Sequence, residues 1–420
     1  MKEVGSMRAY RPLVVLQPTT FCNINCQYCY LPERSKTKRM SLDIIRRIAT
    51  EVLSSDLLTG EIAFLWHLGE PLTVPPSFYE EAFSEIARIN QEYRREYVHT
   101  FQTNATLLNE EWVTLIKRHK IRLGISLDGP AFIHDRQRVK RNGKGTHAAI
   151  LRGVRLLQAN NVPFAVISVL TDFTLDYPDE YFEFFRENGI DQVGYNIDEI
   201  EGIHTSTTFS QSQSVSRYKR FLSRLLELSD QHQDAIRFRE VWTNLRTVVH
   251  GAAPYNLANK PLRILNFDVE GNFSTFCPEL VAATSQKYGD FVMGNIMREG
   301  LADLATNPVF QQVHREIEEG LALCEQTCPY WNYCGGGEPS SKFFEHGRFD
   351  VAETTTCRIH RKATIDVLVD YLEKKVVPGQ QVLQSSEEQF VRTPLADLLT
   401  GTTAPPRLLL SISKVNQERN

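Results

Sequence analysis

The sequence predicts an α/β protein in which a partial (β/α)6 barrel is followed by a cysteine-rich domain. Short apolar runs rich in Val, Ile and Phe alternate with longer segments of helical apolar spacing through the first half of the chain. Strands and helices in series indicate a parallel sheet with helices outside, and six units are fewer than the eight of a closed barrel. The eight cysteines are clustered, three near the amino terminus and five in the second half. A doubly wound sheet is the structural alternative.

The predicted elements follow one another as β/α units. The strands and their helices are 12–17 with 41–54, 61–66 with 76–94, 97–103 with 109–119, 121–126 with 146–160, 163–170 with 177–188, and 192–197 as the last strand. We assign residues 1–204 to the barrel and expect a mostly helical bridge over 205–262. Residues 263–377 form the predicted auxiliary domain, and 378–420, rich in Gln, Ser, Thr and Pro, a mobile tail.

Bulk properties indicate a cytoplasmic protein. The net charge of −4 gives no reason to expect nucleic acid as a partner, and no apolar run approaches the roughly 20 residues that span a bilayer. No secretory signal is visible, so clustered cysteines favour metal or cluster ligation over disulfides. The basic runs Arg34–Arg39 and Arg136–Lys144 are interpreted as solvated surface.

Cys22, Cys26 and Cys29 form a Cys-x-x-x-Cys-x-x-Cys loop directly after the first predicted strand. A [4Fe–4S] cluster normally takes four cysteines, so three thiolates leave one iron open to a cofactor or substrate. The loop also lies where active sites gather in such barrels, at the carboxyl end of a strand. The alternative is a zinc knuckle, for which His67 is the tempting fourth ligand.

This loop resembles the cysteine motif of the radical S-adenosylmethionine (SAM) superfamily. The resemblance implies that the open iron chelates the amino and carboxylate groups of SAM, and that one electron from the cluster then produces a 5′-deoxyadenosyl radical. Tyr28 matches the aromatic residue that stacks by adenine, and Gly69 with Glu70 resembles the Gly-Gly-Glu segment that meets the methionine amino group. Leu68 replaces the first glycine of that segment.

Polar residues at later strand ends resemble the family's other cofactor contacts, and Arg138 is a candidate partner for a carboxylate. Each of these residues alone is also compatible with a helix cap or a turn. The cofactor-binding residues implied are Tyr28, Gly69, Glu70, Asn104, Ser126, Asp128 and Arg138.

The second cysteine set resembles the SPASM extension of peptide-modifying radical SAM enzymes. Spacing aligns Cys324, Cys328, Cys334 and Cys357 as a complete set for one auxiliary [4Fe–4S] cluster. Cys277 matches one ligand of a further cluster, but Glu338 stands where that cluster's next cysteine is expected. We therefore expect two clusters in total, with Cys277 free or recruited. A structural zinc ribbon is the alternative for the four cysteines.

Segments 16–22, 66–71, 101–106 and 126–132 resemble cyclophane-forming maturases of glycine-rich-repeat precursor peptides, the GrrM/OscB type. The resemblance implies a C–C bond between an aromatic ring carbon and a side-chain β-carbon in a ribosomally made peptide. It also implies an electron donor of the flavodoxin or ferredoxin type. Candidates for the substrate-side base are Asp198, Glu199, Glu201 and Glu279.

Other functions remain open at this point. Thioether formation and epimerisation belong to the same enzyme class, as does anaerobic sulfatase maturation. Sulfatase maturases carry a catalytic acid directly after the cysteine that matches Cys277, where this chain has Pro278. A non-enzymatic alternative is an electron-transfer or scaffold protein, which would not need the polar strand ends.

Overall fold

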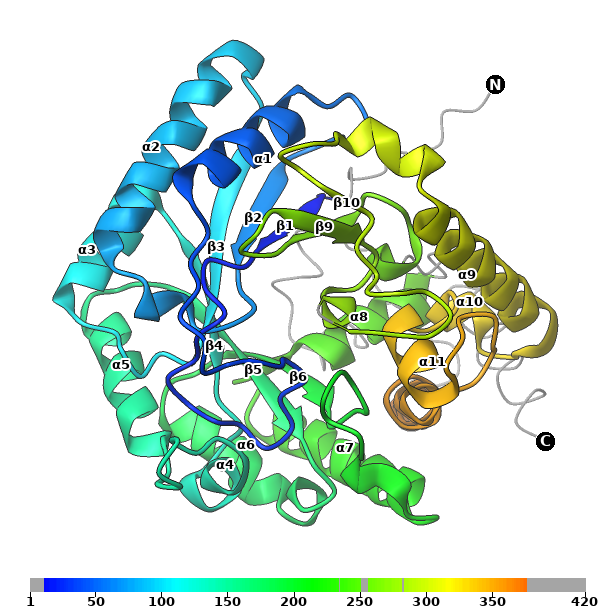
Figure 1. Cartoon of the computed structure of the whole chain (residues 1–420). Coiled ribbons are helices and arrows are strands. Elements are labelled where there is room, and N and C mark those ends of the chain that lie inside the picture. The colour runs from blue at the N-terminus through cyan, green and yellow to red at the C-terminus, as the bar shows by residue number, and fades with distance from the viewer. Residues whose placement is uncertain (1–10, 234, 251–255, 282, 376–420) are drawn as a thin grey trace.

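The computed structural model describes residues 11–233, 235–250, 256–281 and 283–375. Its sheet has ten strands in the order β10-β9-β8-β1-β2-β3-β4-β5-β6-β7. Helices lie outside an arc of strands, and α9 to α11 lie to one side of it (Figure 1). The strands are β1 Leu13–Leu16, β2 Ile62–Trp66, β3 Tyr97–Thr103, β4 Arg122–Ser126, β5 Phe164–Leu170, β6 Gln192–Ile197, β7 Arg237–Phe238, β8 Ile264–Phe267, β9 Asn272–Thr275 and β10 Gly294–Asn295.

The helices agree with the predicted ones in the barrel to within one or two residues. One was not predicted: α4, seven residues long, begins after Pro130 in a stretch that reads as a turn. The helices are α1 Leu42–Ser54, α2 Pro76–Tyr93, α3 Glu110–His119, α4 Ala131–Gln137, α5 His147–Ala159, α6 Pro178–Glu187, α7 Ser214–Gln231, α8 Arg239–His250, α9 Pro308–Thr327, α10 Trp331–Cys334, α11 Pro339–His346 and α12 Ala363–Lys375, with a π-helical turn at Cys357–Lys362.

The six predicted strands are parallel and lie side by side in sequence order. This confirms the partial barrel. A doubly wound sheet would reverse its strand order part-way, so that alternative is wrong.

β8 adds a parallel strand on the other side of β1, with Leu13 opposite Ile264. This pairing was not predicted, because four buried residues carry too little pattern to identify a strand. It hydrogen-bonds the start of the predicted auxiliary domain to the barrel sheet. The division at 262/263 stays a prediction, and the predicted tail lies outside the described residues.

The barrel strands alternate their side chains between the helices and the interior. In β2, Ile62, Phe64 and Trp66 are fully buried under helices, and the Trp66 ring lies 5.2 Å from that of Tyr79 in α2. Parallel strands bring their carboxyl ends to one edge, so the segments after β1 to β4 meet there. None of the described helices is long and apolar enough to cross a bilayer.

Candidate active site at the barrel mouth

The first cysteine loop is held by backbone hydrogen bonds to the segment that follows it and to a segment far away in the sequence. The Cys22 N–H donates to the Arg34 carbonyl at 3.0 Å, and the Asn25 N–H donates to the Val139 carbonyl at 2.7 Å. The loop therefore packs against the chain that follows it, at Arg34, and against the chain after α4, at Val139. Its position at the mouth of the barrel agrees with the sequence prediction.

Donor groups from the barrel approach two of the three thiols. Asn104 Nδ2 lies 4.0 Å from Cys22 Sγ, and Arg138 Nη1 lies 4.0 Å from Cys26 Sγ. Burial raises the pKa of Cys26 to about 11, against the opposing effect of the Arg138 charge. Burial and the nearby Glu70 charge raise the pKa of Cys22 as well. Such thiols ionise only with added positive charge, which cluster iron supplies, so the residues fit the predicted group.

No three His, Cys, Asp or Glu side chains in the described part of the chain converge as ligands of a single ion would. Thiolates that hold a cubane sit at its separate corners and do not need to converge on one point. The finding therefore leaves the cluster prediction as it stands.

The segment after β2 packs directly on the cysteine loop. A Cβ at Gly69, where φ is +128°, would lie 2.3 Å from the Thr19 carbonyl oxygen, so only glycine fits. Leu68, the departure from the family pattern, has φ of +66° and is fully buried. A left-handed leucine costs roughly 1–2 kcal/mol, which explains why a glycine suits this position.

The Glu70 carboxylate is buried and fixed by three donors. It accepts from the Leu72 N–H at 3.0 Å, the Thr103 hydroxyl at 2.5 Å and the Asn104 N–H at 2.8 Å. Burial raises its pKa to about 7. An acceptor held this rigidly is suited to a cationic group such as an amine, as the predicted role requires.

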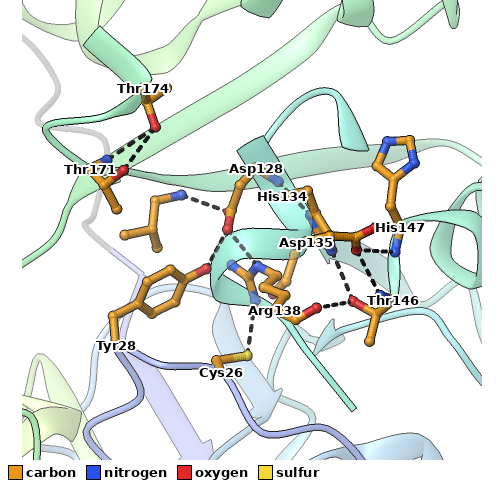
Figure 2. A network of polar contacts seen from close by, with 12 residues as sticks. Cys26, Tyr28, Asp128, His134, Asp135, Arg138, Thr146, His147, Thr171 and Thr174 are labelled. Atoms are coloured by element: carbon orange, nitrogen blue, oxygen red, sulfur yellow. Dashed lines mark hydrogen bonds and ion pairs between the residues drawn. The ribbon is translucent and has the colours of Figure 1, made fainter. Parts of the chain in front are cut away.

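A buried network connects the cysteine loop to the end of β4 (Figure 2). Asp128 accepts the Tyr28 hydroxyl at 2.5 Å and the Arg138 Nε–H at 3.0 Å, and also a backbone N–H of β5 at 2.9 Å. The Asp128 N–H donates to His134 Nδ1, and His134 Nε2 lies 3.0 Å from the Thr146 hydroxyl. The donated N–H fixes the tautomer, so the imidazole carries its proton on Nε2.

The network places Tyr28, Asp128 and Arg138 in mutual contact. Ser126, the last residue of β4, accepts a hydrogen bond from the Gln102 amide at 2.9 Å. Their roles toward SAM stay predictions. Arg138 belongs to the basic run interpreted as solvated, and that interpretation is wrong for this residue, which is 7% exposed because it pairs with Asp128.

Three of the predicted base candidates, Glu199, Glu201 and Glu279, form one buried acidic cluster with Glu338. We call this cluster the acidic pocket. Glu199 accepts the Ser341 hydroxyl at 2.7 Å and the Thr356 hydroxyl at 2.8 Å. Burial raises the pKa of Glu201 and Glu279, and Glu279 adds to the rise at Glu201.

This pocket lies beside the first cysteine loop. Burial raises the pKa of Tyr30, next to Cys29, and the charges of Glu279 and Glu201 raise it further. The carboxylates are therefore close to the barrel mouth.

Asp198 does not join this pocket. Its side chain is 3% exposed, accepts the Thr208 N–H at 2.8 Å and lies 2.7 Å from His204 Nε2. Both carboxylate oxygens of Asp198 therefore bind residues of the loop that follows it, His204 and Thr208. Its catalytic role remains untested, but this geometry favours a structural one.

The second cysteine set gathers at the ends of helices and helical turns. Cys324 is in the last turn of α9, Cys328 caps that helix, Cys334 ends α10, and Cys357 begins the π-helical turn. Burial raises the pKa of Cys357 to about 12, and Cys334 and Cys328 add to the rise.

A cation accompanies the second set, whereas Cys277 lies elsewhere. Lys342 Nζ is 3.8 Å from Cys324 Sγ, which suits a group of thiolates. Burial raises the pKa of Cys277, and the nearby charges of Glu279 and Glu338 raise it further. Cys277 therefore lies with the acidic pocket.

A separate hollow of about 480 Å³ lies at the other end of the barrel. It is lined by the end of α3 and the starts of β4 and β5, including Lys120 and Arg122. The cysteines and strand-end carboxylates lie at the opposite ends of these strands, so this hollow is not part of the site.

With this geometry established, comparisons with known proteins identify the class. The family model described as "Radical SAM superfamily" matches residues 16–185. A relative from Synechocystis, uncharacterized protein sll1766, is 38% identical over 87% of this chain and 92% of its own length. The chain belongs to the radical SAM superfamily and is an enzyme related to maturases of peptides or proteins. [4Fe–4S] clusters and SAM are its cofactors.

More distant relatives include enzymes that modify proteins or peptides. A serine-type anaerobic sulfatase-maturating enzyme from Bacteroides thetaiotaomicron is 31% identical over 42% of this chain and 44% of its own. The chain thus matches less than half of that enzyme's length. The structure of anSMEcpe with bound AdoMet matches at TM-score 0.73, with 19% identity over 87% of this chain and 98% of the other. Streptococcus suis SuiB with precursor peptide SuiA matches at 0.57, with 14% identity over 83% and 76%.

Several site residues were missed by sequence reasoning. Thr146 completes the network around Asp128, and Lys342 accompanies the second cysteine set. His134 follows the fourth predicted strand, but its bond to the Asp128 N–H was not anticipated. None of them has a spacing that marks it. For Arg34 and Arg141, which bind carbonyls of the cysteine loop, the basic runs themselves were the available signal.

Proposed function

We propose that this enzyme joins an aromatic ring carbon to a side-chain β-carbon within a ribosomally made precursor peptide. The observation that carries the proposal is a combination of two features. A complete four-cysteine set accompanies an acidic pocket in which Pro278 follows Cys277. The likeness of the fold to SuiB, solved with a precursor peptide, supports a peptide substrate.

The reaction removes two hydrogens from the peptide for each ring. SAM, when bound at the first cysteine set, supplies a 5′-deoxyadenosyl radical that takes one hydrogen atom. The other hydrogen leaves as a proton and an electron when the ring closes. We propose that Cys324, Cys328, Cys334 and Cys357 hold an auxiliary [4Fe–4S] cluster to accept that electron.

We assign the proton to the acidic pocket. Glu279 and Glu201 lie near Tyr30 and thus near the first cysteine loop. A carboxylate whose pKa is raised by burial accepts a proton near neutral pH, which suits a general base. Glu199 holds the barrel end to α11 through Ser341 and is a positioning residue in this proposal.

Binding of SAM is assigned to the groups already fixed in place. Glu70 is the proposed acceptor for the amino group and Arg138 the partner of the carboxylate, with Tyr28, Gly69, Asn104, Ser126 and Asp128 as their neighbours. Oxygen-sensitive clusters and free cysteines suit a reducing compartment, so we propose a cytoplasmic location and a flavodoxin or ferredoxin as donor.

Co-expression of enzyme and precursor peptide, followed by tandem mass spectrometry, tests the proposal. We expect a loss of two hydrogens per ring and suppressed fragmentation between the linked residues, because one backbone cleavage no longer separates the pieces. A matched peptide with the aromatic residue replaced by Leu should stay unmodified.

Sulfatase maturation is the second candidate, favoured by the 31% identity to the Bacteroides thetaiotaomicron enzyme. Formylglycine formation also removes two hydrogens, but its aldehyde reacts with a hydrazide. A hydrazide-reactive product would contradict the C–C bond. A thioether would require a peptide cysteine, and an epimerase would leave the mass unchanged and take up deuterium from heavy water.

A further inference from the structure

Two basic segments that are far apart in the sequence converge on the first cysteine loop. The chain at 34–39 meets it through the bond from Cys22 N–H to the Arg34 carbonyl. The chain at 136–144 meets it through a β-bridge between Ile24 and Lys140, and through the Gln27 N–H, which donates to Gln137 at 2.9 Å. The loop is therefore enclosed on two sides by basic chain.

Two arginine side chains bind the outer carbonyls of the loop. Arg141 Nη2 donates to the Cys22 carbonyl at 2.8 Å, and Arg34 Nη1 donates to the Cys26 carbonyl at 3.2 Å. We call the exposed or half-buried cations of both segments the basic collar. It consists of Arg34, Lys36, Lys38, Arg39, Arg136, Lys140, Arg141 and Lys144.

Among the residues that the structure describes, most of the collar's charge has no ion-pair partner. Lys36 pairs with Glu33, and Lys38 pairs with Glu270 at 2.5 Å. For the other six cations, no ion pair with any described residue is found. Because the whole chain carries a net charge of −4, this positive field is a local feature.

An aromatic group adjoins the collar. The Phe132 side chain, on α4, is 45% exposed, and its ring lies 5.0 Å from that of Tyr177. The Arg136 guanidinium stands 4.0 Å above the Phe173 ring. A charged rim beside an exposed aromatic anchor is the composition of a protein-docking surface.

Within the collar the cysteine loop itself reaches the surface. Asn25 and Gln27, on either side of Cys26, are both exposed. Cys26, the residue between them, is buried, so this exposed stretch of backbone carries a predicted cluster-binding thiol on its inner side.

We propose that the basic collar is the docking site of a small acidic protein that delivers single electrons to the first cluster. One electron leaves the donor's reduced low-potential centre and enters the cluster, and no bond or proton moves in this step. Charge complementarity favours an acidic partner. The inference rests on membership of the radical SAM superfamily and stands apart from cyclophane formation.

Stopped-flow reduction of the reconstituted holoenzyme by photoreduced flavodoxin tests the proposal. The double variant K140E/K144E reverses two exposed charges, and we expect the rate at low salt to fall by about tenfold or more. The difference should shrink as salt is raised. Reduction by photoreduced deazaflavin, a small uncharged reductant, should keep its rate.

The matched control is R152E/R155E, which makes the same charge change on the exposed face of α5. An equal loss in this control, or no loss in K140E/K144E, overturns the proposal. The proposal is also overturned if K140E/K144E binds the precursor peptide more weakly but is still reduced by flavodoxin at the wild-type rate. If K140E/K144E does not fold, a wild-type rate that is independent of salt overturns the proposal by itself.

Discussion

The two cysteine sets differ in how the chain brings them together. Cys22, Cys26 and Cys29 come from eight consecutive residues, so their spacing alone indicates a cluster. Cys324, Cys328, Cys334 and Cys357 come from the ends of α9, α10 and a π-helical turn. The second set exists only when those elements have packed, so it depends on the fold much more strongly than the first.

Their surroundings differ in the same way. The first set is approached by Asn104, directly after β3, and by Arg138, directly after α4. Glu70 and Asp128 lie close to the ends of β2 and β4. The second set has the buried Lys342 beside it. Three thiolates among strand-end polar groups suit a cluster that binds a cofactor, whereas four suit a closed cluster that only transfers electrons.

The largest expected effect comes from the first set. With Cys22, Cys26 and Cys29 all changed to Ala, SAM cleavage should fall to the uncatalysed background, because no open iron remains. Chromatographic measurement of 5′-deoxyadenosine after chemical reduction checks this. Cleavage that persists would move the reactive centre to the second set.

Changes in the second set should separate cleavage from product formation. We expect Cys324→Ala and Cys357→Ala to retain SAM cleavage but to lose the crosslinked peptide, since the second electron has no acceptor. Both products are measured in one assay by mass spectrometry. If cleavage is lost as well, the second cluster is needed for folding, and its redox role loses this support.

The buried network should be more sensitive than a surface pair of the same chemistry. Asp128→Asn leaves the Arg138 charge buried without its partner, and we expect a loss of about 3–5 kcal/mol in the free energy of unfolding. Asp43→Asn removes one of the two acidic partners of Arg46, whose other partner is Glu85. The Asp43 side chain is 74% exposed, so this change should cost far less than Asp128→Asn. Denaturant unfolding measures both, and equal losses would contradict the structural role of the network.

The smallest effect is a change in the pH dependence of stability. Burial raises the pKa of Glu199, so the folded state holds its proton more tightly than the unfolded chain does. The stabilisation that protonated Glu199 contributes is fully present below the unfolded-state pKa of about 4.5. It is lost as the pH rises through the folded-state pKa of about 7.

Glu199→Gln keeps an acceptor for Ser341 and Thr356. It should reduce the fall in unfolding free energy between about pH 4.5 and 7 by on the order of 1 kcal/mol. Glu92→Gln on the exposed face of α2 is the control. If the unfolding free energy of the variant changes with pH as that of the wild type does, the pKa of Glu199 is not raised by folding.

Most of the barrel could be predicted because its signals are local. The apolar runs of β1 to β6 alternate with amphipathic helices, and the polar strand ends follow from that pattern. β8 and α4 could not be predicted, since they are short and owe their conformation to tertiary pairing and packing.

The sequence predicted which residues belong to the site, but it did not predict the hydrogen bonds and ion pairs between them. Glu70 and Asn104 were identified from motifs, and the hydrogen bond between them joins two strand ends. Arg138 was singled out from its place in the sequence, but its burial depends on its ion pair with Asp128, ten residues away. Asp198 looked like a free acid because a sequence does not indicate that His204 will occupy its oxygen.

Iron and sulfide analysis of the anaerobically reconstituted chain tests the central comparison most directly. Two cysteine sets with one [4Fe–4S] cluster each predict about eight irons per chain, and about four after either set is replaced by Ala. A wild-type value near four would remove the auxiliary cluster and with it the proposed electron acceptor. A value near twelve would contradict the assignment of Cys277 to the acidic pocket, because a third cluster would then need it as a ligand.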